Sequence, residues 1–201
     1  MSFLSMKFLL FLAAAVAGYY VIPRQLQWVW LLIFSYIFYL ASGPAAAVFI
    51  LTTTVTTFLG GLFLEHTDRV LKRALRPDDP LRPLSTDEKK ALKERFKQRK
   101  KWIAALVLLI NFGILAALKY RNFAADNMNL LFGTHFSPAK LLLPLGISFY
   151  TFQSMGYLID VYRGKYAPDR NPFRFALFVS FFPQILQGPI GRYDRLASQL
   201  Y

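Results

Sequence analysis

Polar side chains occur inside two of the most apolar stretches of the chain, where a plain anchoring helix has no need for them. The first stretch, 141–161, carries the amide of Gln153 and ends beside the carboxylate of Asp160. The second, 173–190, carries the amide of Gln184 among apolar residues. Buried amides and carboxylates are costly in lipid unless they face partners or a wet cavity. The two stretches therefore predict a binding site built from hydrogen-bonding groups at membrane depth.

Proline and glycine interrupt both stretches. Pro144 and Gly146 lie in the first, and Pro183, Gly188 and Pro189 lie in the second. Such residues free backbone carbonyls, which are tolerated at membrane depth only inside protein or beside water. The pattern predicts broken or re-entrant helices that line a tunnel, and it indicates a site without indicating its chemistry.

Each polar residue also has a purely structural interpretation. Asp160 either forms a helix-terminus ion pair with Arg163, three residues later, or contacts a substrate. Gln153, Gln184 and Gln187 either bond between helices or contact a ligand. Three tyrosines are expected at the interface or in packing, namely Tyr150, Tyr157 and Tyr162.

Several classes of catalytic site are excluded. The chain has no cysteine, so disulfides, Cys-type zinc sites and thiol nucleophiles are absent. Of its two histidines, His66 is expected at headgroup level after an apolar stretch, and His135 is expected to be a structural loop residue. No Gly-rich phosphate loop, Ser-His-Asp arrangement or paired-carboxylate motif occurs. We therefore predict no catalytic residue and no metal site.

The composition predicts an all-α, multi-pass protein of the cell membrane. Hydrophobic residues make up 55% of the 201 residues and charged residues 17%, whereas soluble domains carry roughly 25% charge. The mean hydropathy is +0.35. Aromatic residues account for 17%, which suits bilayer-facing helices and interfacial belts.

The net charge of +13 predicts a membrane partner and no nucleic acid. Of the 24 basic residues, 13 lie in 65–101, and the others flank apolar runs. Basic residues at the ends of spans follow the positive-inside bias and attract anionic headgroups. This bias predicts that 65–101 lies in the cytoplasm and that the N-terminus faces outside.

Three regions follow from this pattern: three transmembrane helices in 1–64, a basic cytoplasmic segment in 65–101, and further spans in 102–201. The run Phe8–Tyr20 is either a signal peptide or a first span, and we favour the span because more apolar runs follow. Ser85 and Glu88 form a capping-box pattern that starts an amphipathic helix. That helix either lies on the membrane surface or is a solvated connector. The six expected apolar segments are 8–22, 25–40, 45–64, 102–118, 141–161 and 173–190.

The two polar stretches read PLGISFYTFQSMGYLIDVYRG (144–164) and FVSFFPQILQGPIGRYDRL (178–196). They closely resemble the membrane-bound O-acyltransferase (MBOAT) family. The likeness is strongest to the bacterial branch that acts in alginate O-acetylation and teichoic-acid D-alanylation, and 65–101 matches least.

The resemblance implies a helical bundle around a tunnel that crosses the membrane. It implies an acyl group, here acetyl, that is passed from a thioester donor on the cytoplasmic side to a hydroxyl of a cell-surface polysaccharide. The donor is an acyl-CoA or carrier-protein thioester, no cofactor is bound tightly, and an extracytoplasmic acetylation partner can complete the transfer. Ten tunnel-wall positions carry over as substrate-binding residues: Tyr150, Gln153, Asp160, Tyr162, Arg163, Gln184, Gln187, Gly188, Pro189 and Arg192.

The sequence departs from the family at the catalytic base. The resemblance implies a catalytic histidine in the C-terminal half of the family fold, and the chain ends at Tyr201 before any such motif. We therefore expect an N-terminal portion of the fold that is inactive alone and needs a C-terminal half. Two alternatives remain open, a non-catalytic scaffold and a small transporter, because interrupted helices with amides at the midplane are also typical of transporters.

Overall fold

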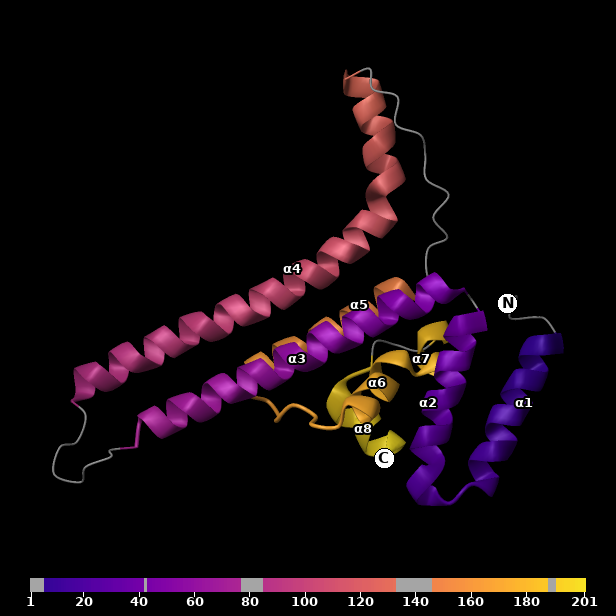
Figure 1. Ribbon diagram of the computed structural model, residues 1–201, viewed down its shortest axis with the longest axis horizontal. Helices are drawn as coiled ribbons and strands as arrows, with labels where there is room; N and C mark the ends of the chain where they lie inside the picture. Colours follow the sequence, from indigo (N-terminus) through magenta and orange to yellow (C-terminus); the bar gives the residue numbers. More distant parts are fainter. Residues whose placement is uncertain (1–5, 42, 77–84, 133–145, 188–190) are drawn as a thin grey trace.

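The computed structural model describes residues 6–41, 43–76, 85–132, 146–187 and 191–201. All regular structure in these residues is α-helical (Figure 1). The first half contains α1 (Met6–Val21), α2 (Arg24–Ala41), α3 (Pro44–Ala74) and α4 (Thr86–Phe132). The second half contains α5 (Ile147–Tyr162), α6 (Pro172–Ser180), α7 (Phe182–Gln187) and α8 (Tyr193–Leu200). The predicted all-α class is confirmed.

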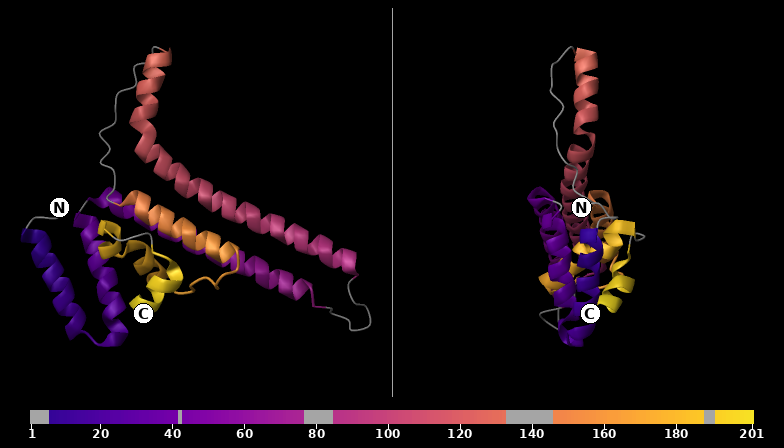
Figure 2. Two further views of the ribbon diagram at one scale, coloured as in Figure 1. Left: turned by 180° about the vertical axis from the view of Figure 1, so that it is seen from behind. Right: turned by 90° about the vertical axis from the view of Figure 1, so that its right-hand side faces the viewer.

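The helices form two groups that meet along α3. Helices α3, α4 and α5 run side by side, whereas α1 and α2 form an antiparallel hairpin at the other end of the molecule (Figures 1 and 2). The short helices α6, α7 and α8 lie between α5 and α2 (Figure 1). The last part of α4 bends away from the other helices and projects alone (Figures 1 and 2).

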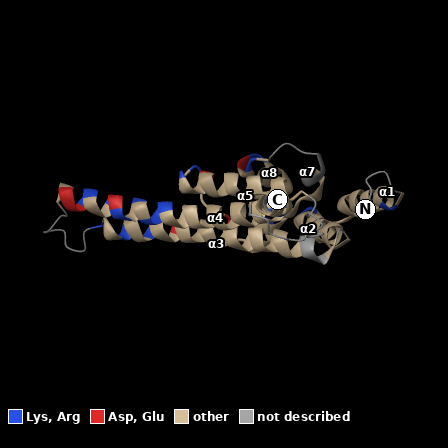
Figure 3. Ribbon diagram, turned by 90° about the horizontal axis from the view of Figure 1, so that it is seen from above, with Lys and Arg blue, Asp and Glu red and all other residues tan. Residues whose placement is uncertain are grey.

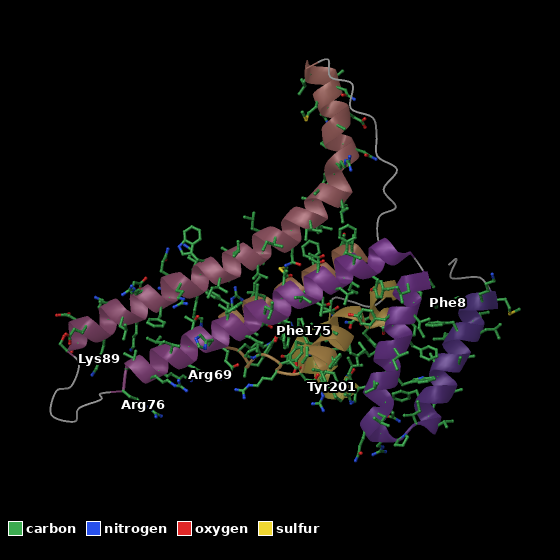
Figure 4. All side chains as sticks on the ribbon, viewed as in Figure 1. Phe8, Arg69, Arg76, Lys89, Phe175 and Tyr201 are labelled. Atoms are coloured by element: carbon green, nitrogen blue, oxygen red, sulfur yellow. The ribbon has the colours of Figure 1, made fainter. Side chains whose placement is uncertain are left out.

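The main core lies where α3, α5 and α6 meet. It contains the fully buried side chains of Leu64, Tyr157, Leu158 and Phe175. Phe175 points into this core from α6 (Figure 4). A second, smaller cluster joins the α1–α2 hairpin to α7 through rings that pack on one another, namely Phe8, Phe11, Phe34, Phe38 and Phe182.

Most of the charged segment 65–101 is helical, although its composition differs from that of the apolar spans on either side. Helix α3 continues from its apolar part through the charged residues to Ala74. The predicted capping box is present, because the Ser85 N–H donates to Glu88 at 2.8 Å and the Glu88 N–H donates to Ser85 Oγ at 3.2 Å. From there α4 runs unbroken to Phe132, so the expected surface helix and the fourth apolar segment are one helix. Lys, Arg and Glu are good helix formers, so this charge run has no reason to break a helix.

Two helical stretches have the length and composition to cross a membrane, Ala47–Ala74 and Thr86–Phe123. Helix α1 is apolar but has only 16 residues, fewer than the roughly 20 that a hydrocarbon core requires. Helix α5 also has 16 residues, and the predicted segment 173–190 is split into α6 and α7 at Phe181. The predicted interruption of that segment is therefore confirmed.

The charges gather on the tips of α3 and α4. Lysines and arginines alternate with a few acids where these two helices lie together, far from the α1–α2 hairpin (Figure 3). Lys100 on α4 bonds to Asp68 on α3 at 2.8 Å, and Arg69 pairs with Glu65 within α3 at 2.6 Å. The Lys100–Asp68 pair holds the two charged tips side by side beyond the apolar core.

Candidate functional site: a polar cavity between α5 and α8

Two glycines set the limits of the helix that carries most of the polar side chains. Gly146 precedes α5 with a φ of +71°, and Gly164 follows it with a φ of +74°. Both are left-handed conformations that side-chain-bearing residues rarely adopt. At the C-terminal end, the Gly164 N–H donates to the Val161 carbonyl at 2.9 Å and turns the chain back toward the helix. The turn brings the loop 165–171 against the polar face of α5.

A polar cavity of about 270 Å³ lies between α5 and the start of α8. From α5 it is lined by Gln153, Gly156, Tyr157, Ile159 and Asp160, and from the other side by Gly191, Arg192 and Tyr193. Its volume is slightly below the ~300 Å³ at which pockets for drug-sized ligands begin, so it suits a small group. Three predicted site residues, Gln153, Asp160 and Arg192, meet in this cavity although 39 positions separate the first from the last.

Gln153 bonds between helices, as one of its two interpretations predicts. Its side chain is 3% exposed, and Nε2 donates to the Phe178 carbonyl at 2.8 Å. That carbonyl lies in the last turn of α6, where helix carbonyls have no partner within the helix. Gln153 therefore fixes the end of α6 against α5 while it also lines the cavity.

Asp160 forms an ion pair at the end of α5, but with a different cation from the one expected. Its Oδ2 lies 3.3 Å from Lys165 Nζ and accepts a hydrogen bond from the Tyr166 hydroxyl at 3.4 Å. Arg163, the expected partner, is exposed. The chain reverses at Gly164, and this reversal is why Lys165 takes the place of Arg163.

Lys165 links the end of α5 to α8. Its Nζ lies 2.7 Å from Asp194 Oδ2 as well as 3.3 Å from Asp160. The hydrogen bond that Lys165 donates to Asp194 raises the pKa of Lys165, and the same bond lowers the pKa of Asp194. Both groups therefore remain charged at neutral pH, and they tie α8 to the rim of the cavity.

Two tyrosines of the cavity wall converge on Asp169. The Asp169 N–H donates to the Tyr157 hydroxyl at 3.0 Å, and the Tyr193 hydroxyl donates to Asp169 Oδ2 at 2.7 Å. Burial raises the pKa of Tyr193, so its phenol stays protonated and donates. The two rings also pack on each other, with centroids 4.9 Å apart. Sequence reasoning missed this network, because no local spacing connects 157, 169 and 193.

The other predicted site residues lie elsewhere or outside the described part of the chain. Tyr150 is fully buried, faces Tyr39 with ring centroids 6.4 Å apart, and has a hydroxyl without a hydrogen-bond partner among the described residues. Tyr162 lies under Lys100, whose Nζ is 5.7 Å from the ring centroid. Gln184 packs against Gly191 at the edge of the cavity. The side chain of Gln187 and the residues Gly188 and Pro189 lie outside the described residues.

The described residues hold no group of three His, Cys, Asp or Glu side chains that could bind a metal ion. His66 is exposed on α3, and His135 lies outside the described residues. The cavity wall thus offers a guanidinium, an amide, phenols and a carboxylate that is already paired. These groups can bind and orient an oxygen-rich molecule, and none of them is placed as a free base.

The chain is similar to three kinds of bacterial acyltransferase over about half of its length. It is 39% identical over 109 residues to a probable alginate O-acetylase AlgI of Azotobacter vinelandii, which covers 52% of this chain and 22% of the relative. It is 36% identical over 118 residues to a peptidoglycan O-acetyltransferase of Helicobacter pylori, which covers 47% and 22%. It is 37% identical over 84 residues to a teichoic acid D-alanyltransferase of Lacticaseibacillus rhamnosus, which covers 42% and 20%.

The match spans about a fifth of the length of each of these relatives. No family model matches the chain, and no solved structure matches it. The predicted resemblance to the bacterial branch of the membrane-bound O-acyltransferases is confirmed by these relatives over about half of the chain.

Proposed function

We propose that this chain takes part in transferring an acetyl group from a thioester donor to hydroxyls of a cell-surface polysaccharide. The relatives support acyl transfer to cell-surface polymers, since their names give alginate, peptidoglycan and teichoic acid as the molecules modified. The observation that carries the proposal is that Gln153, Asp160 and Arg192, three residues of the resembling motifs, meet in one polar cavity.

The proposed reaction is acyl transfer between a thioester and an alcohol. The acceptor oxygen forms a bond to the acyl carbon, the carbon–sulfur bond breaks, and the thiol leaves with the proton that the hydroxyl loses. Charge develops on the carbonyl oxygen in the transition state, and fixed donors beside it lower the barrier. Arg192 is a donor of this kind, whereas the Gln153 amide is already bonded to α6 and the Tyr193 hydroxyl to Asp169.

We assign positioning and binding roles to the cavity residues and no proton-transfer role to any of them. Asp160 is committed to Lys165 and Tyr166, so its carboxylate is a poor candidate for a general base, which must reach the reacting hydroxyl. The base is proposed to come from outside the described residues, as the family resemblance implies. The proposed setting is the inner membrane, with several spans and the donor entering from the cytoplasmic side.

The proposal is tested by acyl transfer in membranes that contain the native gene product. Membranes are supplied with a radiolabelled acetyl thioester and the host's surface polymer, and base-labile acetate on the polymer is counted. We expect ester formation that depends on the protein. An acetate count equal to that of membranes lacking the gene, for every surface polymer of the host, would reject the proposal.

A further inference from the structure

An apolar groove runs between α2, α3 and the start of α6, and it shares no lining residue with the polar cavity. Its volume is about 610 Å³, and its walls include Leu32 and Tyr36 on α2, Val55 and Phe58 on α3, and Phe173 on α6. The groove is open, since the side chains of Ile37, Val55 and Phe173 on its rim are 45%, 51% and 63% exposed. It takes no part in the site described above.

One end of the groove leads to cations along a single face of α2. Positions 24, 28, 32 and 36 are four residues apart, so they lie above one another on the helix. Reading from the groove outward, Tyr36 and Leu32 line its wall, Trp28 follows one turn on, and the exposed Arg24 follows one turn further. Tryptophan followed by arginine is the order in which a membrane interface places these residue types.

Arg174 lies beside this end of the groove and has no ion-pair partner among the described residues. Its guanidinium carbon is 5.7 Å from the centroid of the Trp28 ring and 5.2 Å from that of Tyr201. Tyr201 also fixes the backbone there, since its hydroxyl donates to the Arg174 carbonyl at 3.0 Å. The guanidinium thus lies over two rings, and its N–H groups are the donors that would bind an anion.

Along α3, the apolar residues of the groove are likewise followed by charged residues. Val55 and Phe58 line the groove, and two turns beyond Phe58 comes Glu65, which bonds to Arg170 at 2.8 Å and to Arg69 at 2.6 Å. One carboxylate thus faces two arginines, and the side chain of Arg170 remains 70% exposed. Two arginines, Arg69 on α3 and Arg170 in the loop before α6, thus share one carboxylate two turns beyond the groove wall.

We propose that this groove binds one acyl tail of an anionic glycerophospholipid of the surrounding bilayer, with the phosphate at Arg174. The apolar walls suit a hydrocarbon chain, and their continuation into Trp28, Arg24 and Arg174 suits the headgroup to which that chain is attached. Basic pockets between membrane helices on the cytoplasmic side bind anionic headgroups in this way. The proposal is independent of acyl transfer, because the lipid is a bound component and not a substrate.

The test is photo-cross-linking in bilayers with phosphatidylglycerol that carries a diazirine in one acyl chain, followed by mapping of the labelled peptides. Two substitutions on α3 form a matched pair. Val55→Trp fills the groove, whereas Val48→Trp places the same side chain on the same helix outside it, at a position that is similarly exposed (59% against 51%). We expect label on peptides of α2 and α6, lost in Val55→Trp and kept in Val48→Trp.

A second pair tests the headgroup. Arg174→Gln should reduce the preference for phosphatidylglycerol over phosphatidylcholine about fivefold, the value expected for one cation at the membrane surface. Arg195→Gln, at an exposed arginine of α8, should leave it unchanged. The preference for phosphatidylglycerol over phosphatidylcholine can also be measured on the unaltered protein. The test therefore remains possible if a variant folds poorly. Label spread evenly over all apolar helices, equal labelling of both lipids, or cross-links between two copies through α2 would each overturn the proposal.

Discussion

Helices α4 and α5 contrast in how much of each helix is buried. Helix α5 has 16 residues, and nine of them are buried. Helix α4 has 47 residues, yet among its described side chains the buried ones form a single stripe at Ala104, Val107, Asn111 and Leu115. The resembling motif lies on α5, so the polar residues that mark it are also those on which the packing of α6 and α8 depends. Gln153 and Asp160 thus bond to neighbouring parts of the fold, and they also line the cavity.

The largest expected effect is the loss of the ring at the centre of the α5 packing. Tyr157 is 2% exposed and packs against Phe175, Phe178, Tyr166 and Tyr193. Tyr157→Ala should lower the free energy of unfolding by about 3–5 kcal/mol, as for other large aromatic truncations. Trp102→Ala on α4 removes a ring that is 68% exposed, and we expect its effect to stay within about 0.5 kcal/mol. Denaturant unfolding in one detergent measures the free energy of unfolding of both variants. Equal losses would contradict the difference in burial between α4 and α5.

Close helix approach is the next largest effect. A Cβ at Gly60 on α3 would lie 2.9 Å from Val107 Cγ2 and 3.2 Å from Leu158 Cδ1, whereas a Cβ at Gly113 on α4 meets nothing within 4 Å. Gly60→Ala should therefore destabilise by about 1–3 kcal/mol through overpacking. Gly113→Ala should be neutral or stabilise by up to about 1 kcal/mol, because alanine is the better helix former. Thermal unfolding of the two variants gives opposite signs if α3 packs between α4 and α5 as described.

Loss of the Gln153 amide should lower the free energy of unfolding about as much as Gly60→Ala does, or slightly less. Gln153→Leu removes the donor to the Phe178 carbonyl and should cost about 1–3 kcal/mol, because a buried acceptor loses its partner. Asn111→Leu removes the link of Asn111 Nδ2 to Thr56 Oγ1 at 3.0 Å. Polar links of this kind between membrane helices average only about 0.6 kcal/mol. A loss at Gln153 no larger than that at Asn111 would show that α6 does not depend on α5 for its position.

The smallest effect is the pH response of the exposed pair Lys165–Asp194. Because the pKa of Asp194 is lowered in the folded protein, its stabilising effect is complete above the unfolded pKa of about 3.9 and is lost as the pH falls through the folded value. The pKa of Lys165 is raised, so its contribution is complete below about pH 10.4 and is lost as the pH rises through the folded value. The stability difference between the unaltered protein and Asp194→Asn should be small, flat between these limits, and reduced by salt. A difference that grows in acid would contradict this assignment.

Local features of the fold could be predicted from the sequence, whereas contacts between distant segments could not. The capping box at Ser85 and the interruption before Pro183 each depend on neighbouring residues, and both occur. The expected third and fourth apolar segments, 45–64 and 102–118, were too short: α3 continues through charged residues to Ala74, and α4 joins the helix expected from Ser85 to the fourth segment. The charge of a residue reports its exposure to solvent and says little about where a helix ends. The expected ion pair of Asp160 with Arg163 was wrong. The chain turns at Gly164 and brings Lys165 back to Asp160, and the sequence does not show this turn.

Three of the predicted site residues, Gln153, Asp160 and Arg192, line one cavity although they come from two separate motifs. Their role in binding substrate stays a prediction. Tyr162 lies on another face of α5, against Lys100, because it is two residues from Asp160 and only residues three or four apart share a helix face. Tyr150 is three residues before Gln153, but it packs against Tyr39 one turn nearer the start of α5. The convergence of Tyr157 and Tyr193 on Asp169 requires the loop to fold back, which no spacing in the sequence reveals.

The central claim is that the cavity between α5 and α8 serves acyl transfer, and Arg192 tests it most directly. Arg192 is the N-cap residue of α8 and is exposed at the cavity, and Arg195 is exposed on α8 outside it, so Arg192→Gln and Arg195→Gln change the same charge three residues apart. Acetyl transfer to the surface polymer should fall about 100-fold in Arg192→Gln, in the range for loss of one donor to a developing oxyanion, and should stay unchanged in Arg195→Gln. Equal activity of the two variants, with both proteins present in the membrane at the same level, would contradict the account.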